Sequence, residues 1–288
     1  MDLVNMGGSM FNSDIFSERN VSQERILKLL QNMGYEYVSR TDSDRKRVSY
    51  SKVLYEDELA KFMAKQTYTY RGIKYHFSGE SINKAIKDLD ASLIQGLMMA
   101  SKEIYNTICD GISVPETIAI DGNNLGEQSF DLDYIDFAHP ENNTWQVTEE
   151  FSVEGANGRY SRPDIVVLCN GIPLVVIECK SSAVSVEDGV NQNVRNMMPD
   201  HIPQLFKFAQ IVIAANPEKV KYGTTGTTAK YFVEWKEKNV DWLNNMLNKY
   251  IVDNNYTEQD MAIISLLEQN RLLDIIRYFI IYHYNIKK

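Results

Sequence analysis

Two consecutive apolar runs, at residues 165–168 and 174–177, dominate the hydrophobic pattern of the chain. Both runs lack the alternation of a half-exposed strand, so both predicted strands should be buried on both faces. Asn170-Gly171 stands between them and supplies the two positive-φ residues of a type I′ turn. The pattern therefore predicts a buried β-hairpin over residues 165–177.

Two further segments predict strands that extend this hairpin into a sheet. Residues 144–154 alternate between apolar and polar side chains, as in a strand with one buried face. Residues 209–215 form another continuous apolar run, which is typical of a buried strand. With a helix that begins at Ser185, they predict a β-β-β-α-β order for a core over residues 144–216.

Helical spacing of apolar residues predicts helices around this core. Near the N-terminus, Ser22 is predicted as the N-cap of a helix that Gly34 ends, followed by a short strand at 35–38. Ser185 begins the core helix with the S-x-x-D capping pattern. The other predicted helices cover residues 81–94, 95–109, 202–206 with Asp200 as the cap, 243–247, 257–267 and 271–282.

Other segments predict irregular or surface structure. Residues 1–16 are predicted as a flexible lead-in, and residues 112–140 as a surface loop with a strand. A charged run at residues 42–47 and a tyrosine-rich stretch at 68–77 fit either of two interpretations. One is a solvated turn beside an amphipathic surface, and the other is a contact with nucleic acid.

The composition bounds the class of protein and its environment. The 288 residues are 44% hydrophobic and 24% charged, which is ordinary for a globular protein. The three cysteines show no C-x-x-C spacing, so neither a zinc site nor a disulfide framework is predicted. No run reaches the roughly eighteen apolar residues of a membrane span, and no signal-peptide core is present. The expected location is therefore the cytoplasm, without a membrane partner.

The net charge of −9 argues against tight binding of DNA by this chain alone. Binding of the DNA backbone relies on lysine and arginine side chains that displace counterions. No G-K-[ST] sequence occurs, so no phosphate-binding loop for ATP is predicted. If the chain acts on DNA, we expect other domains or subunits to hold the DNA.

Charged residues at one end of the hairpin predict a functional site. Glu178 and Lys180 are two apart and so point to the same face of a strand, while Asp164 begins the paired strand. Buried charges are costly unless a metal or a charge partner balances them. Two carboxylates suit Mg²⁺, to which the main-chain carbonyl of Cys179 could add an oxygen, and Lys180 could orient a water for phosphodiester hydrolysis. The alternative is a structural ion pair at a strand end, with Lys180 bound to Glu178 or Asp164.

These residues resemble a known nuclease motif. Pro163-Asp164 followed by Glu178-Cys179-Lys180 is similar to the PD-(D/E)xK pattern. The longer string from Arg162 to Lys180 looks like the N-terminal nuclease domain of the restriction (R) subunit of type I restriction-modification enzymes. The resemblance implies an α/β, restriction-endonuclease-like fold, in which helices flank a mixed sheet and further helical elements stand at both ends. It also implies a nuclease domain at 17–235 and a helical segment at 236–288 that leads to an ATPase motor missing from this chain.

The resemblance also suggests site residues outside the hairpin. In many such nucleases a glutamate on an N-terminal helix joins the metal site, which makes Glu24 the first candidate and Glu18 the second. The alternative for Glu24 is a carboxylate that favours the dipole in the first turn of a helix. Related nucleases carry Q-x-x-x-Y after the lysine; here Gln192 matches the glutamine, but Asn196 replaces the tyrosine. Gln192 is expected near the metal or the DNA, or else as an exposed helical glutamine.

The implied function is Mg²⁺-dependent cleavage of double-stranded DNA at non-specific positions by a type I restriction endonuclease. Asp164 and Glu178 would hold the metal, Lys180 would assist the attacking water and Gln192 would support the site. The implied partners are the methyltransferase (M) and specificity (S) subunits and the motor domains of the R subunit, which bind ATP only in the full-length subunit. Two rival interpretations are a stand-alone PD-(D/E)xK exonuclease or repair nuclease and a non-catalytic docking module.

Overall fold

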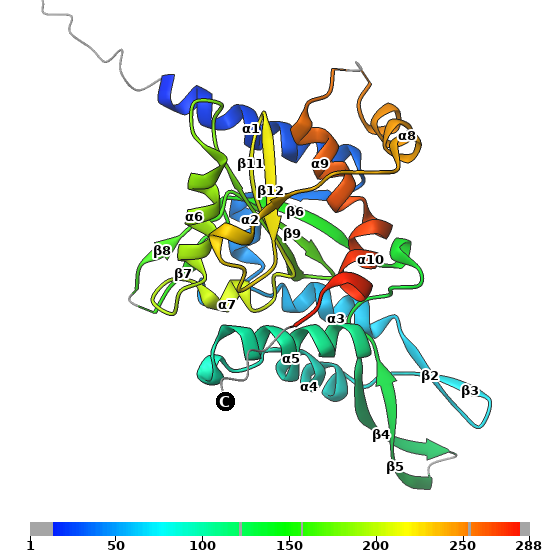
Figure 1. Ribbon diagram of the computed structural model, residues 1–288. Coiled ribbons are helices and arrows are strands. Elements are labelled where there is room, and N and C mark those ends of the chain that lie inside the picture. Colours follow the sequence, from blue (N-terminus) through cyan, green and yellow to red (C-terminus); the bar gives the residue numbers. More distant parts are fainter. Residues whose placement is uncertain (1–13, 121–122, 157, 253–254, 283–288) are drawn as a thin grey trace, which may run out of the picture.

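A seven-stranded mixed sheet lies at the centre of the computed structural model (Figure 1). The structure describes residues 14–120, 123–156, 158–252 and 255–282. The strand order is β1-β6-β9-β10-β11-β12-β13, in which β1–β6 and β10–β11 are parallel and the other pairs antiparallel. The strands are β1 (Glu36–Val38), β6 (Trp145–Glu149), β9 (Ile165–Cys169), β10 (Ile172–Cys179), β11 (Ile211–Asn216), β12 (Lys219–Gly223) and β13 (Val233–Glu234). Helices flank this sheet, so the expected α/β fold class is confirmed.

The predicted hairpin, β9 and β10, is the buried centre of this sheet. Every residue of both strands is buried, because β6 and β11 pair with their outer edges and helices cover both faces. Asn170 and Gly171 have φ values of 50° and 82°, as the type I′ turn requires. The buried Asn170 side chain donates to the carbonyl of Tyr134 at 3.0 Å and to Oδ1 of Asn143 at 2.8 Å. The turn is therefore fixed by neighbouring segments as well as by its own conformation.

Gly171→Ala is expected to lower the free energy of unfolding by about 2 kcal/mol. A Cβ at this position would lie 2.5 Å from the carbonyl oxygen of Tyr55, and the positive φ disfavours any side chain. Gly72→Ala is a matched control, since Gly72 has a φ of +81° but no atom within 4 Å of an added Cβ. Urea unfolding of both variants measures the difference, and equal losses would contradict the steric argument.

Helices α1 (Asp14–Asn32) and α6 (Val186–Asn196) cover opposite faces of the sheet. Successive side chains of β10 alternate between the faces. Glu178 bonds to Asn196 of α6, whereas Cys179, the next residue, lies beside Ser22 of α1. This arrangement places the predicted functional residues on the α6 side of the sheet.

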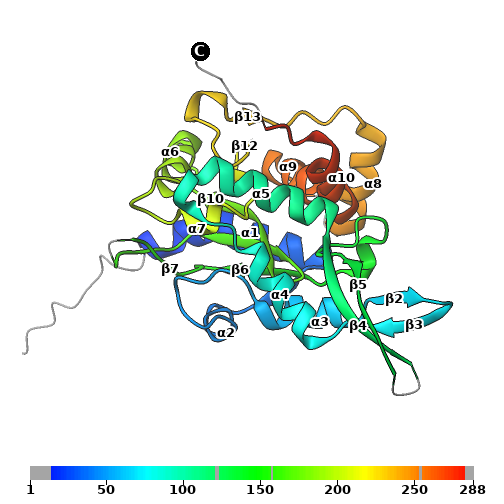
Figure 2. The same cartoon turned by 90° about the horizontal axis from the view of Figure 1, so that it is seen from below.

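The segment between β1 and β6 forms a helical layer with two projecting hairpins (Figure 2). Both figures show the β2–β3 and β4–β5 hairpins extending from the same end of the molecule. The rings of Tyr68 and Phe130 stack between them, with centroids 4.1 Å apart. The elements are α2 (Arg40–Arg45), α3 (Glu56–Ala64), β2 (Thr67–Tyr70), β3 (Ile73–His76), α4 (Gly79–Leu89), η1 (Leu93–Gln95), α5 (Leu97–Asp110), β4 (Ile112–Ile120), β5 (Asn123–Leu132) and η2 (Pro140–Asn142).

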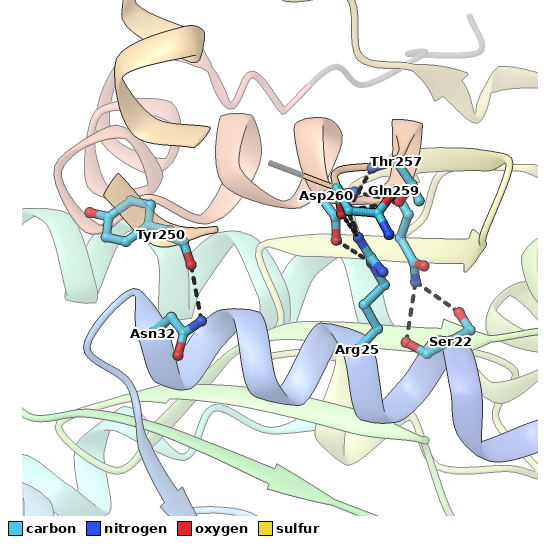
Figure 3. A network of polar contacts seen from close by, with 8 residues as sticks. Ser22, Arg25, Asn32, Tyr250, Thr257, Gln259 and Asp260 are labelled. Atoms are coloured by element: carbon cyan, nitrogen blue, oxygen red, sulfur yellow. Dashed lines mark hydrogen bonds and ion pairs between the residues drawn. The ribbon is translucent and has the colours of Figure 1, made fainter. Parts of the chain in front are cut away.

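The C-terminal helices pack against α1 through a polar network (Figure 3). Arg25 of α1 forms an ion pair with Asp260 at 2.6 Å, and Gln259 donates to Oγ of Ser22 at 2.8 Å. Thr257 and Asp260 form the capping box at the start of α9 (Glu258–Leu267), the helix that carries Gln259 and Asp260. The remaining elements are β7 (Val153–Glu154), β8 (Tyr160–Ser161), α7 (Pro203–Phe206), η3 (Ala229–Tyr231), α8 (Val240–Tyr250), α9 (Glu258–Leu267) and α10 (Gln269–Phe279).

The structure corrects several element boundaries. Helix α1 begins at Asp14, so Ser22 is a buried residue within the helix rather than its N-cap. Of the expected lead-in, residues 14–16 belong to α1, and residues 1–13 lie outside the described residues. Residues 112–120 and 123–132 form the paired strands β4 and β5, where a surface loop with a strand was expected. Ile202, not Asp200, precedes α7 as its N-cap.

Candidate active site

The predicted carboxylates converge where β9 begins and β10 ends. Asp164 stands immediately before β9, and its Oδ2 accepts a hydrogen bond of 2.7 Å from the main-chain amide of Cys179. Glu178, the residue before Cys179, has no solvent-exposed surface. Burial raises the pKa of the Glu178 carboxyl well above its ordinary value, and the neighbouring charge of Asp164 raises it further. The sheet therefore brings together two carboxyl groups that oppose each other's ionisation.

The two oxygens of Glu178 differ in their surroundings. Oε1 accepts a hydrogen bond of 3.3 Å from the side-chain amide of Asn196. Oε2 is buried and accepts no hydrogen bond from a donor among the described residues, and the carboxyl group of Asp164 lies within hydrogen-bonding reach of Glu178. A buried carboxylate oxygen without a donor is costly, and a hard cation would satisfy it. The donor set thus fits Mg²⁺, with Oε2 of Glu178 and the carboxylate of Asp164 as the side-chain ligands.

Two carboxylates are fewer than a closed metal site needs. Among the described residues, no group of three or more His, Cys, Asp and Glu side chains is placed to hold a metal ion. Mg²⁺ characteristically keeps several waters and takes few protein ligands, so two carboxylates are compatible with it. The amide of Cys179 is engaged by Asp164, and a role for its carbonyl oxygen stays a prediction.

Lys180 and Gln192 also meet, as the positions of their elements require. Nζ of Lys180 donates to Oε1 of Gln192 at 2.7 Å. Gln192 lies on α6, which begins after the predicted N-cap, Ser185, whose side chain accepts from the amide of Glu187. The ammonium group is thus held by a neutral amide, while its charge acts on Glu178 in the direction that lowers the pKa of that carboxyl.

The structure does not bring Glu24 to the carboxylates. Glu24 lies on the exposed side of α1. Its neighbour Gln23 is 8% exposed and donates to the carbonyl oxygen of Asp164 at 3.0 Å and to Oε2 of Glu149 at 3.5 Å. Glu18 lies in the part of α1 whose side chains the structure does not describe. Helix α1 therefore reaches the site through Gln23, which the sequence reasoning missed.

Two glutamates at the end of β6 border the site. Glu149 accepts hydrogen bonds from Tyr37 and Gln23, and burial together with the bond to Glu149 raises the pKa of Tyr37 to about 12. Glu150 has a positive φ of 49°, and its amide donates to the carbonyl of Asp164 at 3.0 Å. Burial and the charge of Asp164 raise the pKa of Glu150, although Arg162 lies 3.9 Å away. Adjacency to the strand was the only signal for these residues, because no spacing rule selects them.

The fold and the site define a class: a mixed α/β protein with an Asp-Glu-Lys site at the end of its central hairpin, in which Glu178 is buried and Asp164 and Lys180 are partly buried. The chain matches the family described as type I restriction enzyme R protein N terminus over residues 15–231. The chain belongs to this family.

Several curated relatives align with most of this chain. A Methanocaldococcus jannaschii protein that carries the name of a type I restriction enzyme endonuclease subunit, MjaIXP, is 27% identical and aligns over 92% of this chain and 26% of its own length. The type I restriction enzyme HindI endonuclease subunit of Haemophilus influenzae is 25% identical over 91% of this chain and 24% of its own. The chain thus spans about a quarter of the length of these relatives. Within the described residues, no helix has the length and apolarity needed to cross a membrane.

Proposed function

We propose that this chain is the Mg²⁺-dependent endonuclease domain of a type I restriction enzyme R subunit, with a PD-(D/E)xK active site. The observation that carries the proposal is Glu178, a fully buried carboxylate with one oxygen that accepts no hydrogen bond, next to Asp164 and two residues before Lys180, which directly follows the strand. Ionisable groups with strongly shifted pKa values collect at functional sites, because catalysis uses the charges that stability disfavours. Membership of the R-protein family supports the same function.

Each residue of the site would have its own role in phosphodiester hydrolysis. Asp164 and Glu178 would hold Mg²⁺, with the carbonyl of Cys179 as a further oxygen ligand. When bound, the metal would polarise a phosphoryl oxygen and lower the pKa of a water. The amide of Cys179 fixes the orientation of the Asp164 carboxylate, and Gln192 fixes the Lys180 ammonium. Lys180 would then orient the attacking water or stabilise negative charge on the phosphate.

The substrate in this proposal is double-stranded DNA, cut at positions without sequence preference. The net charge of −9 indicates that other parts of the assembly supply most of the DNA grip. The partners would be the M and S subunits and the R subunit's own motor domains, where ATP would bind. A stand-alone exonuclease or repair nuclease would need its own basic DNA-binding surface, which the acidic balance disfavours.

Calorimetric titration with Mg²⁺ and Mn²⁺ tests the proposal. The wild-type chain is expected to bind the metals, and Asp164→Ala and Glu178→Ala are each expected to lose this binding. Glu127→Ala, which removes an exposed carboxylate of β5, is the control and should bind like the wild type. Glu24→Ala tests the predicted role of Glu24 as a metal ligand. Because Glu24 is exposed on α1, we expect this variant to retain metal binding.

The outcomes separate the two functional classes. Binding that both alanine variants lose would support the nuclease site. A wild-type chain that binds neither metal would contradict the metal site proposed for this chain and favour the docking module. Binding retained in both variants would place the metal elsewhere and reject the assignment of Asp164 and Glu178.

A further inference from the structure

One face of α6 carries two carboxamide side chains that contact Glu178 and Lys180. Gln192 and Asn196 are four apart, so they lie on the same side of the helix. Gln192 accepts from Lys180 at 2.7 Å, and Asn196 donates to Oε1 of Glu178 at 3.3 Å. Glu178 and Lys180 are themselves two apart and share one face of β10. Two carboxamides, one helical turn apart, therefore match the two functional side chains of the strand.

This match depends on the close approach of α6 to the sheet. Gly189 lies one turn before Gln192, and a Cβ there would stand 3.1 Å from Cβ of Ala214 and 3.5 Å from Cγ of Lys180. Asn193 is fully buried and donates to the main-chain carbonyl of Ile213 at 2.9 Å. Gly189 permits the approach and Asn193 fixes α6 on β11, which holds Asn196 in reach of Glu178.

The hydrogen bond from the Asn196 amide makes the surroundings of the two Glu178 carboxylate oxygens unequal. Asn196 is only 3% exposed and Glu178 has no exposed surface, so water does not compete freely for this bond. The donor engages Oε1 and leaves Oε2 without a hydrogen-bond donor among the described residues. We infer that Asn196 is a positioning residue, which fixes the Glu178 carboxylate so that Oε2 faces the metal. This inference rests on the proposed metal site.

A purely structural role predicts something different from positioning. Asn193 and Asn196 are both buried carboxamides on α6. The Asn193 amide donates to the main-chain carbonyl of Ile213, whereas the Asn196 amide donates to the side chain of Glu178. Removing either amide should lower thermal stability if both serve only packing. Only the removal of the Asn196 amide should weaken metal binding if Asn196 positions Glu178.

The test compares Asn196→Leu with Asn193→Leu in calorimetric titration with Mn²⁺, alongside thermal unfolding without metal. Leucine branches at Cγ as asparagine does, cannot donate a hydrogen bond, and keeps water out of the space that the amide occupied. Loss of a group that orients a metal ligand typically weakens affinity by about 10–100-fold, which is the change expected for Asn196→Leu. Asn193→Leu is expected to bind Mn²⁺ within about twofold of the wild type, whatever its loss of stability. If either leucine variant fails to fold, Asn196→Ala and Asn193→Ala replace the pair under the same criterion.

Three results would overturn the inference. Wild-type affinity in the Asn196 variant would show that the amide does not position the ligand. An equal loss of affinity in both variants would assign the effect to the seating of α6. A wild-type chain that binds no Mn²⁺ would overturn the proposed metal site together with this inference, and the wild-type titration alone identifies that case.

Discussion

Replacing Lys180 by methionine in the R subunit assembled with its proposed M and S partners is expected to slow the cleavage of plasmid DNA about a thousandfold, with Mn²⁺ affinity of the chain almost unchanged. Methionine keeps an unbranched side chain as far as Cε and removes the ammonium group. Nζ of Lys180 donates to Gln192, so its loss should leave the side chains of Asp164 and Glu178 in place. The effect should therefore appear in the rate of hydrolysis at saturating metal, measured by gel quantification of nicked and linear plasmid.

Lys84→Met is the matched control for this prediction. Lys84 is an exposed residue of α4, distant in sequence from the hairpin, and the same substitution there should preserve the cleavage rate. Cleavage by the Lys180 variant within tenfold of the wild type would contradict the catalytic role of the ammonium group. A large parallel loss of Mn²⁺ affinity would instead assign Lys180 to metal binding.

Glu178→Gln is expected to stabilise the metal-free protein by about 2–4 kcal/mol at neutral pH. The wild-type carboxylate is fully buried beside Asp164, and its Oε2 lacks a hydrogen-bond donor. Glutamine keeps the shape of the side chain and removes the charge that burial disfavours. Saturating Mn²⁺ should reverse the order, because it stabilises only the protein that binds it. Urea unfolding with and without metal measures both effects.

The pH dependence gives an independent check on Glu178. Its folded-state pKa is raised above the ordinary value of 4.5, so the folded protein holds the proton more tightly than the unfolded chain. The stability that this group contributes is fully present below pH 4.5 and is lost as the pH rises through the folded-state pKa. The advantage of Glu178→Gln should therefore be small near pH 4 and grow toward pH 8. A constant difference across this range would contradict the assigned cause.

The sequence predicted the centre of the fold because the strongest signals there are local. Continuous apolar runs and an Asn-Gly pair determine β9, β10 and their turn without reference to the rest of the chain. The turn brings the ends of the two strands together, so the convergence of Asp164 and Glu178 followed from the same local signals. Ser185 marks the start of α6 and so placed Gln192 on that helix, whereas its expected role near the site came only from the resemblance to related nucleases.

The features that were missed depend on contacts between distant segments. Residues 112–140 were predicted as a surface loop with a strand, whereas the structure pairs β4 with β5. Glu116 stands between Val114 and Ile118 on one face of β4, and a charged side chain there argues against burial of that face. Glu116 is nevertheless buried, because it accepts hydrogen bonds from the amide and hydroxyl of Ser78. Such a partner cannot be read from the strand itself.

The N-terminal residue at the site was missed for a related reason. Gln23 and Glu24 are adjacent, and which of them faces Asp164 depends on how α1 is rotated about its axis. That rotation is set partly by the C-terminal helices, through the Arg25–Asp260 and Ser22–Gln259 contacts. Nothing within α1 distinguishes the two residues.

The Arg25–Asp260 and Ser22–Gln259 contacts have a consequence for folding during translation. Arg25 and Asp260 are 235 residues apart, and translation at ~5–20 residues per second separates their synthesis by roughly 10–50 s. Throughout that interval α1 lacks its ion pair with α9. A nascent chain can therefore form the central hairpin well before the polar network between α1 and α9 exists, so the packing of α9 against α1 is a late event in folding.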